Sequence, residues 1–218
     1  MSNVPVLAIE NVSIYDNSSV MFDEMLCHRI GLLPIKTDLK DYKLGDKVKL
    51  VLEKEGPCTV YSKDIKCTDP KIEVIHKHVP VVKLKKDQHV KMEMEALMGV
   101  GKDHVKWQPA LVSYYEVPTL VQEKEVKNSE EILKQAPNGW LDVKAGKFFL
   151  KDPYETQFSK EFLEKISNGI LSLEFEKDSF VLSIETHGSL SSKEILESAI
   201  DVLSEKLEVF EKEIKKST

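Results

Sequence analysis

Side chains able to bind a metal ion occur at two places in the chain. Cys27 stands beside His28, and His76 is two residues from His78, a spacing that places both imidazoles on one face if this segment is a strand. A structural zinc site needs four ligands at short spacings, and neither place supplies a third or a fourth. The sequence therefore predicts no metal site.

A glycine-rich segment is the other candidate for chemistry. Gly99-Val100-Gly101-Lys102 has the residue types of a phosphate-binding loop but not the Gly-x4-Gly-Lys-Ser/Thr spacing of a Walker motif. The chain also contains no Gly-x-Ser-x-Gly, no His-Glu-x-x-His and no Asp-rich loop that would hold magnesium. The sequence thus predicts a protein without catalytic residues of its own.

Residues 20–35 predict one short helix. Residues 17–19 offer N-cap side chains, Gly31 suits the left-handed position after a helix, and Pro34 prevents continuation. Arg29 falls within the apolar face, either to bind the last carbonyls of its own helix or to form an ion pair with a partner chain. The apolar face comprises Phe22, Met25, Leu26 and Ile30, and the opposite face comprises Glu24, Cys27 and His28.

Two segments resemble the signatures of the D-type subunit of archaeal RNA polymerase, a relative of the bacterial alpha subunit and of the third subunit of eukaryotic RNA polymerase II. The first signature is an acidic pair followed by His-Arg-Ile/Leu-Gly-Leu-hydrophobic-Pro, here Asp23, Glu24, His28, Arg29, Ile30, Gly31, Leu32 and Pro34. The second signature is residues 99–110, which resemble the family's Gly-x-Gly-x-x-His-Ala-Lys-Trp-x-Pro segment with Val105 at the usual Ala.

The resemblance assigns both signatures to contact with the second-largest polymerase subunit. The second signature would be a glycine-shaped loop that presents large side chains with polar tips, which suit protein–protein contacts. An equal alternative is that Trp107 fills the core of its own domain. The predicted contact residues are Glu24, His28, Arg29, His104, Lys106 and Trp107.

The C-terminal segment predicts a long helix. Ser191 and Glu194 form a capping box at its start. Six apolar residues then follow at the 4-3-4-3-4 spacing of a coiled-coil seam, which would bury against a partner or, alternatively, within the chain's own domain. The resemblance favours pairing with the small subunit L. The six residues are Leu196, Ile200, Leu203, Leu207, Phe210 and Ile214.

Composition describes a globular protein of one or two domains. The 218 residues are 41% hydrophobic and 31% charged, with a net charge of −6, which argues against a broad nucleic-acid-binding surface. Three cysteines fit a reducing compartment, and there is neither a membrane-length apolar run nor a signal peptide. We expect a cytoplasmic protein without direct sequence-specific nucleic-acid binding.

The predicted fold class is α+β, with antiparallel strands and a long C-terminal helix. Apolar alternation places strands at residues 4–15, 47–53, 59–65 and 111–121, and two or three more across 72–84 and 89–97. It also predicts a small hairpin at 140–150 and another at 170–186 that turns at 176–179. Short helices are predicted at 129–135 and 160–166. The predicted organisation is a discontinuous dimerisation domain (1–39 and 169–218), a mostly β insert domain (40–122) and a degenerate ferredoxin-like appendage (123–168).

In several archaeal relatives this appendage holds iron–sulfur clusters. Clusters are ligated by thiolates, and no cysteine follows Cys67, so we predict no cluster. Residues 136–139 (Ala-Pro-Asn-Gly) stand where a Cys-Pro-x-Gly would lie. The resemblance also implies an N-terminal strand and helix that precede the first predicted strand in the family and that this chain is expected to lack.

The predicted function is a non-catalytic assembly subunit of archaeal DNA-directed RNA polymerase. It would pair with subunit L, seat the second-largest subunit and lie near small subunits N and P. Two alternatives stay open: a homodimeric interaction module that uses the same seam, and a stand-alone metal- or redox-binding protein.

Overall fold

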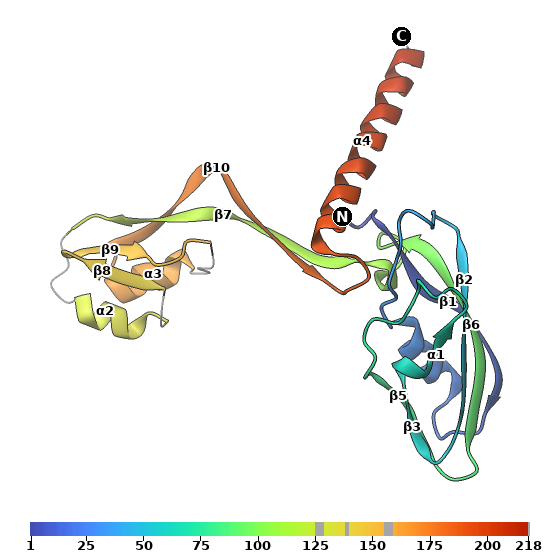
Figure 1. The fold of residues 1–218 in the computed structure, drawn as a ribbon. Coiled ribbons are helices and arrows are strands. Elements are labelled where there is room, and N and C mark those ends of the chain that lie inside the picture. The colour runs from blue at the N-terminus through green and yellow to red at the C-terminus, as the bar shows by residue number, and fades with distance from the viewer. Residues whose placement is uncertain (125–128, 138–139, 155–158, 218) are drawn as a thin grey trace. The chain divides into compact units, whose positions relative to one another are not determined.

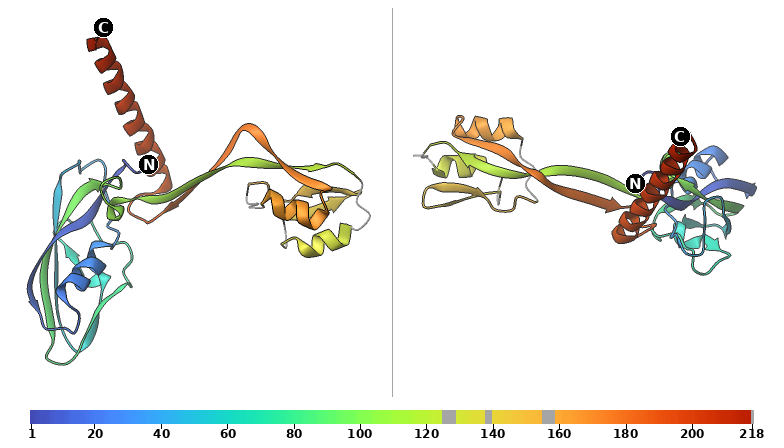
Figure 2. Two further views of the ribbon diagram at one scale, coloured as in Figure 1. Left: turned by 180° about the vertical axis from the view of Figure 1, so that it is seen from behind. Right: turned by 90° about the horizontal axis from the view of Figure 1, so that it is seen from above.

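The computed structural model describes residues 1–124, 129–137, 140–154 and 159–217 (Figures 1 and 2). The chain divides into two compact units, Met1–Val112 with Ile184–Thr218, and Ser113–Ser183. No helix among the described residues combines the length and the apolar character needed to cross a membrane.

The first unit is built on a four-stranded antiparallel sheet in the order β1-β6-β2-β4. Leu50 of β2 pairs with Met94 of β6, and Leu7 of β1 pairs with Met98. Every second side chain of β6 from Val90 to Met98 is buried, as the alternation predicts. The strands are β1 (Pro5–Asn17), β2 (Lys47–Glu55), β4 (Lys66–Cys67) and β6 (His89–Val100).

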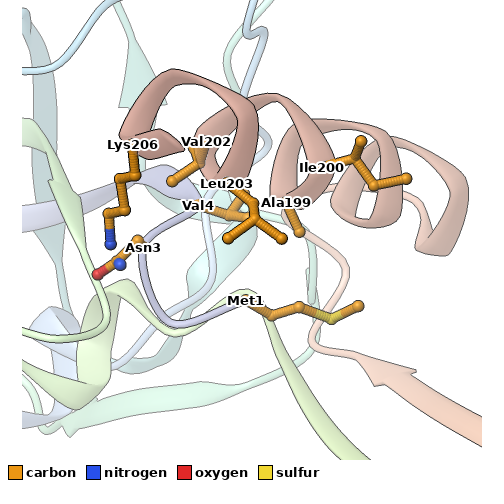
Figure 3. A pocket seen from close by; sticks show the side chains of 8 residues that line it. All are labelled: Met1, Asn3, Val4, Ala199, Ile200, Val202, Leu203 and Lys206. Carbon is orange, nitrogen blue, oxygen red and sulfur yellow. The ribbon is translucent and has the colours of Figure 1, made fainter. Parts of the chain in front are cut away.

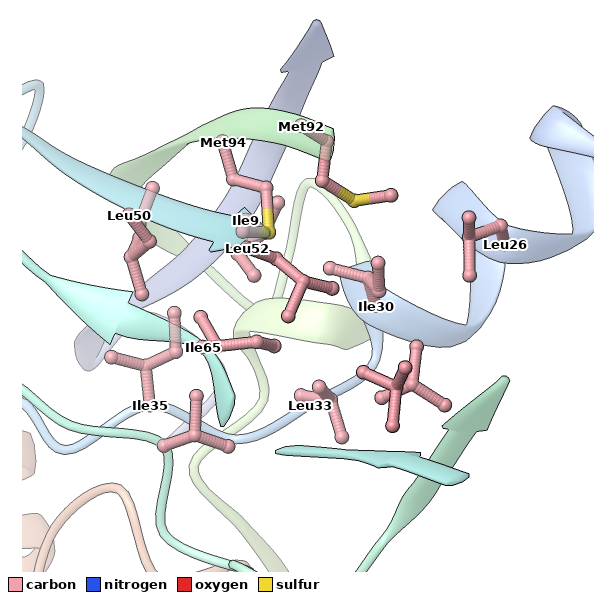
Figure 4. Close-up of a cluster of buried hydrophobic side chains, with 14 of the residues drawn as sticks. Ile9, Leu26, Ile30, Leu33, Ile35, Leu50, Leu52, Ile65, Met92 and Met94 are labelled. Atoms are coloured by element: carbon pink, nitrogen blue, oxygen red, sulfur yellow. The ribbon is translucent and has the colours of Figure 1, made fainter. Parts of the chain in front are cut away.

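Helix α1 (Asp23–Gly31) packs on this sheet through Leu26 and Ile30 (Figure 4). Both side chains are fully buried in the larger core cluster, together with Leu52 and Met92. A two-stranded sheet of β3 (Cys58–Tyr61) and β5 (Pro80–Leu84) contributes Val60, Val82 and Leu84 to the same cluster.

The predicted ends and apolar face of α1 need correction. The N-cap is Phe22, which has no side-chain capping bond, because Asn17 donates to the Met21 carbonyl and to Asp23 in the preceding turn. Gly31 is the last helical residue, and its successor Leu32 is right-handed, so no left-handed cap forms. Phe22 and Met25 are exposed, which leaves the buried face narrower than predicted.

The predicted strand at residues 72–84 is also wrong for its first half. Only β5 is a strand there, with one isolated bridge between Ile35 and Val74. His76 and His78 lie in the exposed loop before β5, so the shared strand face inferred for them does not exist. The strand predicted at 59–65 likewise ends at Tyr61 and continues as a short 3-10 helix, η1 (Ser62–Asp64).

Helix α4 (Ser192–Ser217) joins the first unit by its N-terminal turns. The predicted capping box is present: the Ser191 amide donates to Glu194 Oε2 at 2.9 Å, and the Glu194 amide donates to Ser191 Oγ at 3.3 Å. Ile195 is fully buried in a second core cluster with Val4 and Val6 of the N-terminal segment. The chain's own core therefore holds the start of the helix.

The second unit contains two helices, a hairpin and parts of two long strands. The hairpin turns through Ala145 and Gly146, both at positive φ, as predicted, and its core includes the fully buried Leu163 and Leu171. Both predicted helices are confirmed, whereas Asn138 and Gly139 of the segment 136–139 lie outside the described residues. The elements are β7 (Ala110–Gln122), α2 (Ser129–Gln135), β8 (Leu141–Lys144), β9 (Lys147–Leu150), α3 (Lys160–Ser167) and β10 (Leu171–Thr186).

The hairpin predicted at residues 170–186 does not form. Strand β10 continues through the predicted turn and pairs with β7 instead. The residues of the predicted turn still distort the strand. Asp178 adopts a left-handed backbone at φ 64°, and β10 arches away from β7 in its middle (Figure 1). Tight-turn residues here distort a strand without reversing it.

The α+β fold class is confirmed. The predicted four-part domain division stays a prediction, because the compact units of the structure are two and do not distinguish the four parts. The second unit starts at Ser113 and ends at Ser183, wider than the predicted appendage at 123–168, because β7 and β10 pair with each other.

Candidate protein–protein contact surfaces

Two adjoining hollows on the first unit form the first candidate surface. One, of about 490 Å³, lies against β1, the outer side of α1 and η2 (Val105–Trp107), and the other measures about 390 Å³. They share Leu32, Val105 and Lys106. We call the pair the histidine groove, after its lining residues His28 and His104 in one hollow and His76 and His187 in the other.

Apolar side chains lie at the centre of the histidine groove. Leu32 is 49% exposed and Val105 is 63% exposed. Leu32 and Val105 line both hollows, while the imidazoles and Gln108 each line one of them. The surface thus combines exposed apolar residues with polar ones, the usual composition of a protein contact.

The structure brings together three of the six residues predicted to contact a large subunit. His28, His104 and Lys106 line the same hollow. Glu24 and Arg29 are exposed on α1 but do not line either hollow. The Arg29 guanidinium donates to the Pro80 carbonyl at 2.5 Å, so it ties α1 to β5 and does not bind the end of its own helix.

Trp107 is a core residue. It is 7% exposed, belongs to the cluster with Val4 and Ile195, and donates from Nε1 to the Leu97 carbonyl at 2.9 Å. A Cβ at Gly99 would lie 2.4 Å from the indole ring, which explains the glycine at that position. Of the two roles predicted for Trp107, the core role is correct. The core that Trp107 fills lies between β1 and the start of α4.

Lys106 holds the η2 loop against β1. Its Nζ lies 4.5 Å from the centre of the Trp107 ring, binds the Ile9 carbonyl at 3.2 Å and forms an ion pair with Glu10. Only 14% of its side chain is exposed. The loop is thereby fixed with His104 and Val105 on the outside, and His104 accepts from the Lys106 amide at 3.2 Å.

Cys27 lines the histidine groove as a neutral thiol. Partial burial, followed by the negative charges of Asp23 and Glu24, raises its pKa above the ordinary value. A thiol in this state is a poor nucleophile and a poor metal ligand. Among the described residues, no three His, Cys, Asp or Glu side chains gather in a way that could hold a metal ion.

The second candidate surface is the seam, the six apolar residues of α4 named above. Their exposed fractions run from 39% for Leu196 to 64% for Phe210. A hollow of about 300 Å³ borders the start of the seam, where Met1 and Val4 face Ala199 and Leu203 (Figure 3). The seam therefore presents a continuous apolar strip that the first unit flanks at one end.

Comparison with known proteins identifies the family. Residues 12–113 match the model described as the RNA polymerase Rpb3/RpoA insert domain. The chain is 32% identical to DNA-directed RNA polymerase subunit Rpo3 of Methanopyrus kandleri, over 98% of this chain and 83% of the relative. It is 32% identical to Rpo3 of Pyrococcus furiosus (100% and 86%) and 33% identical to Rpo3 of Methanobrevibacter smithii (96% and 85%). The chain belongs to the Rpo3 family of DNA-directed RNA polymerase subunits.

This assignment confirms the sequence-based prediction at the level of the family: the chain is a subunit of a DNA-directed RNA polymerase, and transcription is its process. The individual partners predicted for it, subunits L, N and P and the second-largest subunit, are not part of what the family name states.

The positions of the cysteines bear on the iron–sulfur prediction made from the sequence. The cysteines of the chain are Cys27, Cys58 and Cys67, and all three belong to the first unit. Cluster ligation requires several thiolates around one centre, and the absence of a cluster stays a prediction.

Sequence reasoning missed the apolar centre of the histidine groove. Leu32 and Val105 belong to the two signature segments, but an apolar residue type does not by itself show exposure. His187 follows β10, and no local pattern indicates that it lines a hollow with residues of the two signature segments.

Proposed function

We propose that this Rpo3-family chain is a non-catalytic assembly subunit of an archaeal, cytoplasmic RNA polymerase, equivalent to the D-type subunit. It pairs through the seam with the small subunit L. The resulting heterodimer then seats the second-largest subunit on the histidine groove, with small subunits N and P nearby.

The exposed seam is the observation that carries this proposal. Burying one fully exposed large apolar side chain contributes about 1.5–3 kcal/mol. Because the six seam residues are 39–64% exposed, their burial contributes about half of the corresponding sum, about 5–9 kcal/mol before the costs of association. Leu207, Phe210 and Ile214 are each at least half exposed, beyond the turns that the second core cluster reaches. A long helix with this apolar strip is suited to a protein partner.

Co-expression with subunit L tests the pairing. We expect a one-to-one complex by size exclusion and mass analysis, and its loss in a variant with Leu207→Asp and Phe210→Asp. The matched control places the same residue on the opposite face, as Lys212→Asp with Lys216→Asp, and should keep the complex. A seam variant that pairs as well as the wild type would contradict the proposal.

The histidine groove is tested at its most exposed apolar residue. Val105→Asp puts a charge at the centre of the groove and should block recruitment of the second-largest subunit to the heterodimer. The control is Val105→Ala, the residue of the family pattern, which should leave recruitment intact. Equal recruitment by both variants would show that this face is not the contact.

We also propose that the second unit functions without an iron–sulfur cluster. The purified chain, prepared without oxygen, should contain no stoichiometric iron or acid-labile sulfide, and a chelator should leave its melting temperature unchanged. Stoichiometric iron and sulfide would overturn this and would favour the redox alternative.

A further inference from the structure

We propose that the charges beside the seam select against an antiparallel second copy of this chain and for a different chain with a complementary edge. That partner presents basic residues to Glu197 and Glu211 and an acidic residue to Lys206. The inference rests on the proposed use of the seam for pairing and adds the chemistry of the partner's contact surface.

Heptad geometry assigns the flanking positions. With Leu196, Leu203 and Phe210 at d, and Ile200, Leu207 and Ile214 at a, the e edge of the helix carries Glu197, Ser204 and Glu211, and the g edge carries Ala199, Lys206 and Glu213. All of these except Ala199 are exposed. In a coiled coil, residues at e and g face the partner helix beside the apolar seam and decide which partner is accepted.

An antiparallel second copy can overlap the whole seam in one register. Leu203 then meets Leu207 of the second copy, and the remaining seam residues pair outward in the same way. In this register Glu197 faces Glu211 of the second copy, and the symmetry repeats that contact. Lys206 faces Lys206 of the second copy. Each charged contact between matching edges is therefore a like-charge contact, which opposes self-pairing.

Contacts within the helix do not remove these charges. Glu197 lies 3.7 Å from Lys193 and Glu211 lies 2.6 Å from Lys215, but both lysines are largely exposed. Solvent-exposed ion pairs of this kind are weak and screened by salt. Both carboxylates remain available to a basic partner.

A parallel second copy would carry an attractive contact between Lys206 and Glu211 of the second copy, which the symmetry repeats. It would also bring two first units to the same end of the coil, because Ile195 anchors each unit to the first turns of its own α4. An antiparallel partner would place the rest of its own chain at the opposite end of the coil. The antiparallel arrangement with a different chain satisfies both the charges and the anchoring.

Self-association of the full chain directly tests whether the charges beside the seam oppose pairing with a second copy. The variant Glu197→Lys with Lys206→Gln turns the antiparallel like-charge contacts into attractive or neutral ones. Analytical ultracentrifugation should show self-association about tenfold tighter than that of the wild type. The control, Glu205→Lys with Lys212→Gln, makes the same changes in residue type at f positions on the opposite face and should behave as the wild type.

Pairing with subunit L provides the second readout. The same variant should bind L about tenfold more weakly, with no change in the control. Equal binding of L by wild type, variant and control would overturn the charge inference and leave the proposed function intact. Absence of any complex with L would count against the proposed function. The self-association measurement would still test whether the charges beside the seam oppose a second copy. A wild-type dimer that Lys206→Gln weakens would indicate parallel self-pairing and overturn the inference.

Discussion

At the scale of single residues, Trp107 shows how one signature side chain serves the fold. The indole fills the space above Gly99, donates to the Leu97 carbonyl and supports the Lys106 ammonium on its face. Together these contacts fix the η2 loop and leave His104 and Val105 outside. Some residues of this signature therefore hold the loop in place, and others, His104 and Val105, remain exposed on it.

The close approach of Gly99 and Trp107 gives the first prediction. Gly99→Ala places a methyl group inside the indole, and the displaced ring should destabilise the fold by about 1–3 kcal/mol in urea unfolding. Gly31→Ala is the control, because its added Cβ would meet nothing closer than the Ile9 carbonyl oxygen at 3.8 Å. Equal stability of the Gly99 variant and the wild type would mean that the ring is not held against this glycine.

Residue types alone could not separate contact residues from structural ones. Lys106 and Trp107 have the large size and polar tips of interface residues, yet both are used inside the unit. Arg29 was expected at a helix end or a partner, and it binds the carbonyl of Pro80, 51 residues further along the chain. Of the six predicted contact residues, His28 and His104 are exposed and line the groove, and their contact with a large subunit stays a prediction.

At the scale of elements, α4 depends on its first turn. The Ser191 hydroxyl, followed by the Ser191 amide, lowers the pKa of Glu194 below its ordinary value, because both donate to the carboxylate. A carboxyl group with a lowered folded pKa stabilises the fold above its unfolded pKa, and this stabilisation is lost as the pH falls through the folded pKa.

The capping box therefore predicts a pH dependence. Glu194→Ala should be less stable than the wild type near neutral pH, by about 1 kcal/mol, the usual contribution of a helix cap. The difference should shrink as the pH falls from about 6 to about 3, because protonation removes the wild-type advantage. Urea midpoints across this range measure it. Glu197→Ala, on the next turn and without a capping bond, is the control, and a difference independent of pH would contradict the mechanism.

Local pattern was sufficient for some elements and insufficient for others. The apolar repeats of α4 and the alternation of β6 predict both elements, because burial on one face follows directly from the period. The hairpin predicted within β10 fails because β10 pairs with β7, which ends at Gln122, 49 residues before β10 begins, and distant pairing leaves no local signal. Short α1 shows the same limit, since Phe22 and Met25 share the helical face but not the core.

At the scale of the whole molecule, the chain has more than one core. The first unit has two clusters, centred on the four-stranded sheet and on the contact between β1 and α4. The second unit has its own cluster, with Ile132 and Phe148 from elements that lie within residues 113–183. Units with separate cores need not unfold together.

Separate cores give the last prediction. Leu163 in the second unit and Leu52 in the first are both fully buried, and each Leu→Ala change should cost about 2–5 kcal/mol in its own unit. Calorimetry should then show that Leu163→Ala lowers one transition while Leu52→Ala lowers another, and hydrogen exchange should locate each loss of protection. The two variants control for each other, since they delete the same atoms from equally buried sites. A single transition that both variants lower equally would mean that the two units unfold as one. Independent unfolding would instead leave the seam and the histidine groove, both on the first unit, unaffected by damage to the second.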